Sequence, residues 1–266
     1  MTEKDARTAG RHPRPEPSPS TREQVAPWRR DAVLSCAALT KRYGELVAVN
    51  ALTFSLERGT VTGFLGPNGA GKTTTLRLLL GLAEPTTGEA QVFGRRYREL
   101  EQPIRRVGAV LESSDLHPSR SGRDHLRTLA LAARLPNSRV EEVLQLVELN
   151  GVAGRRVKTY SLGMRQRLGL AAALLGDPEL LILDEPANGL DPAGVHWLRT
   201  FLQQLAQQGR TVLISSHLLA EVAQTVDQVL IIDHGRLLAG GRLDELTGGN
   251  RTLADVYLEL TAGGAS

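Results

Sequence analysis

Short aliphatic runs alternate along the chain with longer segments whose apolar residues recur at helical spacing. The runs that predict strands are Val33–Tyr43, Ala51–Leu56, Thr60–Leu65, Gln91–Phe93, Val107–Leu111, Leu180–Leu183, Thr211–Ser215 and Gln228–Ile232. The segments that predict helices between them are Gly71–Leu82, Ser161–Leu175, Pro192–Gln208 and Leu218–Thr225. Strands that alternate with helices favour an α/β fold with a mostly parallel sheet and helices on both faces. The first two strands instead predict an antiparallel β subdomain.

The middle and the two ends of the chain differ from this α/β pattern. Residues 122–154 have helical periodicity only, so we expect a helical insertion at about 113–176 within one folded domain over 32–248. Residues 1–31 contain five prolines and no apolar periodicity, which predicts a disordered arm. Residues 249–266 are expected to form a short C-terminal helix and a tail.

Composition and charge exclude several classes of protein. The single cysteine, Cys36, cannot form an internal disulfide, so a disulfide-stapled secreted fold is excluded. Residues 1–30 carry seven basic and four acidic groups, which accounts for the whole net charge of +3 and leaves a neutral body. A neutral body argues against a nucleic-acid partner. The longest uncharged apolar stretch, Leu168–Gly176, is far shorter than the ~18 residues that a transmembrane helix needs.

A glycine-rich segment between the strand Thr60–Leu65 and the next helix has the spacing of a phosphate-binding P-loop. Its residues are Gly66, Pro67, Asn68, Gly69, Ala70, Gly71, Lys72 and Thr73, and Thr74 follows. The glycines allow backbone N–H groups to converge on phosphate oxygens, and the helix N-terminus favours negative charge. Lys72 can reach the β- and γ-phosphates, and the Thr73 hydroxyl can ligate Mg²⁺. The alternative is an ordinary glycine turn before a helix, which the Lys-Thr pair and the flanking elements disfavour.

Two acidic residues end the strand Leu180–Leu183. Four aliphatic residues predict a buried parallel strand, and ligands bind at the carboxyl ends of such strands. Asp184 is therefore the candidate for holding the metal, directly or through water. Glu185 is the candidate for orienting and deprotonating an attacking water. A helix cap could explain one of these carboxylates but explains both poorly.

In this order, the motifs resemble those of the nucleotide-binding subunits of ABC transporters, over about residues 33–248. The segment Tyr160–Met164, with Ser161 twenty-three residues before Asp184, resembles the family's signature. It departs from the common Leu-Ser-Gly-Gly-Gln at three places but keeps Ser161 and Gly163, which in the family contact phosphate. Ser161 is also a suitable N-cap for the following helix, so a plain capped helix start is the simpler alternative.

Three further matches follow the family's order. The segment Asn188–Asp191 resembles the D-loop, which places Asp191 at the dimer contact. His217, after the strand Thr211–Ser215, resembles the switch histidine that contacts the γ-phosphate. Tyr43 resembles the aromatic residue that stacks on adenine, a contact worth ~1–3 kcal/mol by analogy with base stacking. A lone histidine or tyrosine is more often structural, so these matches depend on their order.

One position departs from the family's pattern. Glu112 stands where the family usually has glutamine, at the entry to the helical insertion. A carboxylate there can ligate Mg²⁺ but adds negative charge near the γ-phosphate, which bears on the timing of hydrolysis. Glu112, the Tyr160–Met164 signature and the run His117–Arg123 resemble ATPases of bacterial exporters of the bacitracin-resistance and antibiotic self-immunity type.

The resemblance implies a P-loop NTPase (RecA-like) core with ATP and Mg²⁺ as cofactors. It also implies that ATP is bound between the P-loop of one chain and the signature of another, most simply in a homodimer. Translocation would require a separate transmembrane permease, which would hold this chain at the cytoplasmic face of the membrane. The alternatives are a soluble ABC-type ATPase with a non-transport partner and a small-molecule kinase. The first usually has coiled coils or two cassettes, and the second has no need for Ser161, Asp191 and His217.

Overall fold

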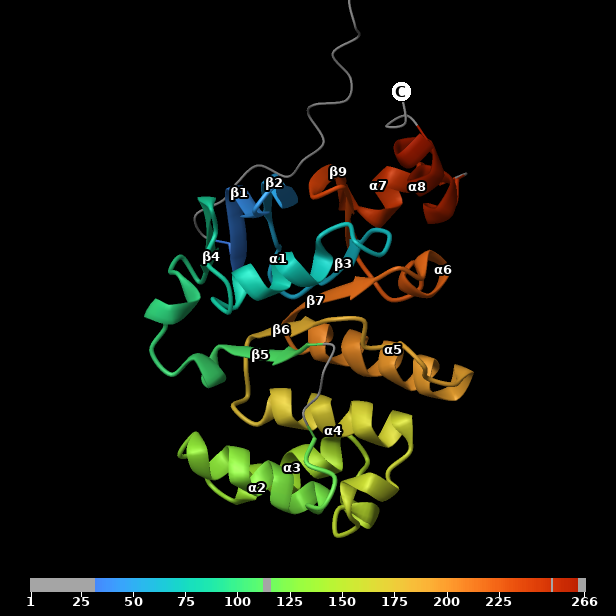
Figure 1. The fold of residues 1–266 in the computed structure, drawn as a ribbon. Helices are drawn as coiled ribbons and strands as arrows, with labels where there is room; N and C mark the ends of the chain where they lie inside the picture. The colour runs from blue at the N-terminus through green and yellow to red at the C-terminus, as the bar shows by residue number, and fades with distance from the viewer. Residues whose placement is uncertain (1–31, 112–115, 250, 263–266) are drawn as a thin grey trace, which may run out of the picture.

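The computed structural model describes residues 32–111, 116–249 and 251–262, which form two sheets with helices around them (Figure 1). The smaller sheet is antiparallel and has the order β2-β1-β4. Its strands are β1 (Leu34–Tyr43), β2 (Leu46–Ser55) and β4 (Thr87–Val92). This sheet matches the antiparallel subdomain that the sequence predicts.

The larger sheet has six strands in the order β5-β6-β7-β3-β8-β9. These strands are β3 (Val61–Leu65), β5 (Val107–Val110), β6 (Leu180–Leu183), β7 (Thr211–Ser216), β8 (Gln228–Asp233) and β9 (Arg236–Arg242). The first five strands of this order pair in parallel, and β9 pairs antiparallel to β8 at the edge. The mostly parallel sheet is therefore confirmed, whereas β9 was not predicted.

Side chains alternate between the two faces of the large sheet, and both faces are covered. On one face, Phe64, Ile182 and Leu213 belong to a core that includes α1 and the small sheet. On the opposite face, the adjacent Leu65 and Leu183 belong to a second core formed with α5 and the helical insertion. The predicted arrangement of helices on both faces is thus confirmed.

Outside the insertion, the helices of the described residues pack around the two sheets. They are α1 (Lys72–Leu79), α5 (Pro192–Gln207), α6 (Leu219–Val222), α7 (Leu243–Thr247) and α8 (Leu253–Ala262). Helix α6 is shorter than predicted because the N–H groups of Gln224 and Thr225 donate to carbonyls three residues back, which turns the chain tightly before β8. None of the helices in the described ranges has the length and apolar character to cross a membrane.

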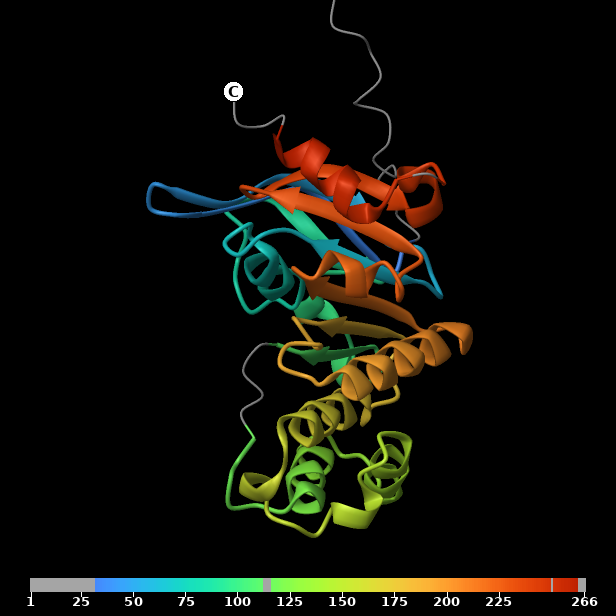
Figure 2. The same ribbon diagram turned by 90° about the vertical axis from the view of Figure 1, so that its right-hand side faces the viewer.

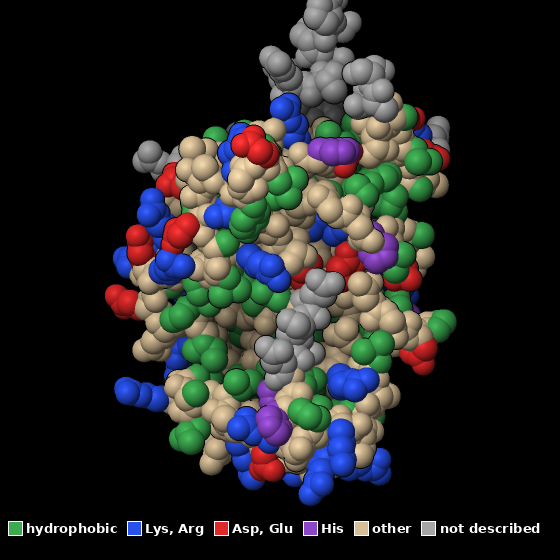
Figure 3. All heavy atoms as spheres, in the orientation of Figure 1, with side chains coloured by type: hydrophobic (Ala, Val, Ile, Leu, Met, Phe, Trp, Pro, Cys, Tyr) green, Lys and Arg blue, Asp and Glu red, His purple; other side chains and the backbone are tan. Residues whose placement is uncertain are grey.

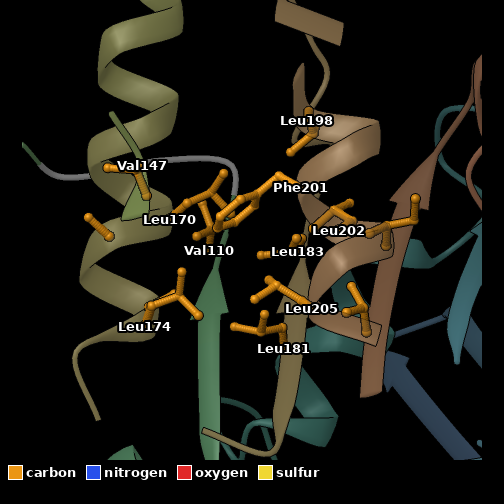
Figure 4. Close-up of a cluster of buried hydrophobic side chains, with 14 of the residues drawn as sticks. Val110, Val147, Leu170, Leu174, Leu181, Leu183, Leu198, Phe201, Leu202 and Leu205 are labelled. Carbon is orange, nitrogen blue, oxygen red and sulfur yellow. The ribbon is translucent and has the colours of Figure 1, made fainter. Parts of the chain in front are cut away.

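The insertion forms a helical layer at the bottom of Figures 1 and 2, beneath the large sheet. Its helices are α2 (Gly122–Ala132), α3 (Ser138–Leu146) and α4 (Leu162–Leu174). Short 3₁₀ turns complete the described secondary structure at Tyr97–Glu99, Pro103–Arg105, Asn150–Val152 and Val157–Thr159. Figure 4 shows the apolar interface through which α4 and α5 pack beside β5 and β6.

Candidate functional site

The P-loop connects β3 to α1 and leaves no space for side chains at two of its glycines. A Cβ at Gly66 would lie 2.4 Å from the Ile232 carbonyl oxygen, and one at Gly71 would lie 2.3 Å from that of Ala48. Gly71 also has a φ of 99°, which a side chain disfavours. These contacts explain the glycines and fix the loop at the carboxyl end of β3, with the N-terminus of α1 directed into it.

Lys72 begins α1, and its side chain turns back over the loop. Its Nζ atom donates to the carbonyl oxygens of Gly66 at 2.7 Å and Pro67 at 3.2 Å. The side chain is buried and also lies 3.4 Å from Glu185 Oε1. These contacts hold the flexible Lys72 side chain in place, so that its positive charge has a fixed position inside the loop.

Asp184 lies between two hydroxyl groups from different elements. Thr73 Oγ1 donates to Asp184 Oδ2 at 2.7 Å, and Ser215 Oγ donates to Asp184 Oδ1 at 2.5 Å. Asp184 is only 3% exposed, so its orientation is set by these two bonds. A carboxylate beside a threonine hydroxyl is an oxygen donor pair of the kind that Mg²⁺ prefers.

Glu185 stands next to Asp184 but faces the opening. Its backbone N–H donates to Ser215 Oγ at 2.9 Å, and its φ is +48°, a conformation that non-glycine residues rarely adopt. Its carboxylate lies 3.0 Å from His217 Nδ1 and, through its other oxygen, close to Lys72. The structure thus brings the predicted base and switch histidine into direct contact, and the base also lies beside the P-loop lysine.

Lys72, Thr73, Glu185 and His217 line a cleft of about 650 Å³, which is large enough for a nucleotide. Asp184 does not line it but bonds to Thr73. Of the predicted residues, the lining includes Tyr43, Pro67, Asn68, Gly69, Gly71, Lys72, Thr73, Thr74, Glu185 and His217. Tyr43 is about half exposed, and Lys41 Nζ lies 5.0 Å from its ring centroid. Figure 3 shows basic, acidic and histidine side chains interspersed around the middle of one face.

Sequence reasoning missed part of this cleft. Leu46, Val47 and Ala48 line it from β2, and His234 lines it from the turn between β8 and β9. Ser215, which bonds both acidic residues, was read only as part of a strand. No local sequence pattern marks these residues, because tertiary pairing of distant strands brings them here.

Three of the predicted site residues lie away from the cleft. Ser161 is exposed at the start of α4, where its Oγ accepts from the Met164 N–H at 3.2 Å. Asp191 is exposed at the start of α5 and caps it in the same way, through the Gly194 N–H at 2.8 Å. Neither these residues nor Gly163 line the cleft. Glu112 falls outside the described residues, as does the predicted arm.

Comparisons with known proteins agree with this geometry. The family model described as "ABC transporter" matches residues 49–188. The bacitracin transport ATP-binding protein BcrA of Bacillus licheniformis is 41% identical over 229 residues, covering 85% of this chain and 75% of the relative. The Nod factor export ATP-binding protein I of Ralstonia nicotianae is 39% identical over 219 residues, covering 80% and 68%.

Solved structures give the same result. A structure titled as an ATP-binding subunit of an ABC transporter superposes with a TM-score of 0.77 and 30% identity, covering 86% of this chain and all of that chain. The P-loop NTPase fold is therefore confirmed. With its motifs, its fold and its relatives in agreement, the chain belongs to the ABC transporter family as an ATP-binding subunit with ATPase activity.

Proposed function

We propose that this ATPase powers an exporter by closing two copies of the chain over ATP and Mg²⁺. The observation that carries the proposal is a division within one chain. Lys72, Thr73 and Glu185 line the cleft, and Asp184 bonds to Thr73 there. Ser161 and Asp191 are exposed outside the cleft, at the starts of α4 and α5. A second chain can supply the Ser161 and Asp191 side chains that the cleft lacks, and a homodimer with two equivalent sites is the simplest arrangement.

In this proposal the cleft binds ATP and positions the reacting groups. The P-loop N–H groups and Lys72 bind the phosphates, and Tyr43 stacks on the adenine. Thr73 and Asp184 would hold Mg²⁺, which neutralises charge on the β- and γ-phosphates when it is bound. Glu112 is proposed as a further Mg²⁺ ligand at the entry to the insertion.

The water that attacks the γ-phosphate would be oriented by Glu185, which also accepts its proton. His217 lies beside this carboxylate and would contact the γ-phosphate. On closure, the partner's Ser161 hydroxyl and Gly163 N–H reach the same phosphate and exclude bulk water. Exclusion of water strengthens each of these polar contacts in the transition state.

The proposal of export is supported by the relatives. The relatives are named for bacitracin transport and Nod factor export, so a drug, antibiotic or lipid-like substrate is proposed. A separate permease would provide the pathway and would hold this chain at the cytoplasmic face of the membrane. Cells that contain the permease should lose export when Glu185→Gln replaces the wild-type chain. Unchanged export would contradict the proposal.

Mixing two inactive variants tests closure between chains. Ser161→Arg blocks the signature, and Lys72→Ala removes the phosphate-binding charge. In a mixed dimer, one site carries both changes and the other carries neither. An equimolar mixture that pairs at random should recover about a quarter of wild-type turnover, because half of the dimers have one intact site.

Separate titrations with Mg-ATP should show that Ser161→Arg still binds nucleotide, and thermal unfolding should show that it is folded. The substitution removes a helix cap, so a loss of about 1 kcal/mol of stability is expected and is tolerable. If Ser161→Arg hydrolyses ATP normally by itself, the signature does not act across chains. If mixing restores no ATPase activity although both variants are folded, the expectation that one intact site turns over ATP in a mixed dimer is wrong.

A further inference from the structure

The signature segment and the D-loop of one chain are in direct contact. A Cβ at Gly189 would lie 2.5 Å from Leu162 Cδ2, and Gly189 has a φ of +71°. A Cβ at Gly163 would lie 3.6 Å from Leu190 Cδ2. Leu162 stands where the family's common signature has glycine, and its side chain uses the space left open by Gly189.

One turn further along α4, Arg167 joins the insertion to the core. Its guanidinium carbon lies 3.9 Å from the ring centroid of Trp197 on α5. An amino group of the same side chain donates to Glu148 Oε2 at 2.6 Å and approaches the Val147 carbonyl oxygen at 3.4 Å. The Arg167 side chain is three-quarters buried, which strengthens its contact with the Trp197 ring, whereas Glu148 is mostly exposed. The Arg167 side chain thus connects helix α4 with the end of α3 and with α5.

The apolar layer beneath this arginine continues the connection. Trp197 stacks on Phe201 with ring centroids 4.9 Å apart. Figure 4 shows Phe201 of α5 directed toward Leu170 of α4 and Val110 of β5, within one buried cluster. Helix α4 is therefore joined to α5 and to the D-loop before it at three successive levels, which are the Leu162 contact, the Arg167–Trp197 contact and the Phe201 cluster.

We propose that Leu162 and Arg167 are positioning residues that hold the signature segment and the D-loop in a fixed relation. Ser161 and Asp191, the caps of α4 and α5, then meet the partner chain as one preformed surface. The inference rests on the proposed action of Ser161 across chains. Neither Leu162 nor Arg167 lines the cleft, so they act on closure and leave the first binding of ATP unchanged.

The test separates these two steps. All variants are made in the Glu185→Gln background, where ATP-bound dimers should accumulate, and dimers are measured by light scattering at a series of protein concentrations. Arg167→Gln and Trp197→Leu should each raise the concentration needed for dimers about tenfold or more. Binding of a fluorescent ATP analogue to the monomer should change by less than about twofold. Trp197→Phe retains an aromatic face and should stay within about threefold of the parent.

Arg127→Gln is the matched control. Arg127 lies on α2, its side chain is about half exposed, and it lies 3.7 Å from Asp124 on the same helix, so its loss should leave both readouts unchanged. Thermal unfolding of every variant distinguishes a closure defect from a folding defect. Parent-like dimerisation of folded Arg167→Gln and Trp197→Leu would overturn the inference.

A double-variant cycle tests the Leu162 contact. Gly189→Ala should weaken closure strongly, since its methyl group meets Leu162 and its backbone is left-handed. Leu162→Gly alone should weaken closure at least about threefold, because the contact with Gly189 is lost. In the Gly189→Ala background the same change should weaken closure no further, because the contact is already disrupted and the clash is removed. Purely additive effects would show that the contact has no role in closure.

Ser161→Arg in the same background distinguishes failure of the proposed function from failure of the positioning role of Leu162 and Arg167. If Ser161→Arg forms dimers normally, the proposed function itself is wrong. If it fails to close while the positioning variants close like the parent, only the present inference is wrong.

Discussion

Replacing Glu185 by glutamine removes a charge and a proton acceptor but keeps the size of the side chain. In the structure this carboxylate lies 3.4 Å from Lys72 Nζ and 3.0 Å from His217 Nδ1. Loss of a general base typically slows turnover by ~10²–10⁴-fold, which corresponds to about 3–5 kcal/mol of transition-state stabilisation. We expect this range for Glu185→Gln at saturating Mg-ATP, measured as phosphate release.

Binding of ATP, unlike turnover, should not weaken. Without the carboxylate, Lys72 retains its bonds to the Gly66 and Pro67 carbonyls and no longer shares its charge with Glu185. The affinity for ATP should therefore be unchanged or higher, and thermal unfolding should shift little. Glu179→Gln, on an exposed side chain outside the cleft, is the control and should leave turnover unchanged. Turnover of Glu185→Gln within a few-fold of wild type would refute the assignment of the base.

Three further predictions concern buried polar groups. Burial, reinforced by nearby positive charge, lowers the pKa of His125, so the folded state disfavours the proton and stability should fall as pH drops below about 6.5. His125→Phe should reduce that loss of stability, measured in thermal unfolding scans at pH 7.5 and 5.5. An unchanged pH dependence would contradict the assignment. Ser215→Ala leaves an oxygen of Asp184 without its donor, so it should cost about 1–3 kcal/mol of stability and raise the Mg²⁺ concentration needed for turnover; an unchanged Mg²⁺ requirement would refute the positioning role. Tyr160→Phe removes the hydroxyl that donates to the Val152 carbonyl at 3.0 Å, which should cost about 1 kcal/mol without altering ATP affinity, and a large change in affinity would contradict a purely structural role.

The sequence was most informative where one kind of signal dominates a segment. Leu180–Leu183 was predicted with its observed bounds because four consecutive aliphatic residues fit a strand buried on both faces. The P-loop was equally clear, since its glycines are required by contacts that a side chain would obstruct. Strand β9 was missed because Arg236–Arg242 contains two adjacent glycines and lies at the edge of the sheet, where burial imposes little pattern.

The candidate site also contains residues that motifs identify and residues that they do not. Lys72, Asp184 and Glu185 could be named from motifs, because the chemistry of phosphate and metal binding fixes residue types at short spacing. Ser215 could not be named, since its importance depends on the alignment of β7 with β6, thirty residues away along the chain. The contact of Arg167 with Trp197 likewise depends on how α4 packs against α5, which helical periodicity alone does not specify.

The cap at the start of α4 has a consequence for the thermodynamics of association. Because Ser161 Oγ already accepts from the Met164 N–H, its rotamer is ordered when the chain folds, before a second chain arrives. Ordering a free side chain at an interface costs about 0.5–1.5 kcal/mol, and this residue avoids most of that cost. A hydroxyl retains its own proton while it accepts a bond, so Ser161 still has a donor to offer to an anion. The same side chain can thus stabilise its own helix and meet a phosphate with little loss of conformational entropy.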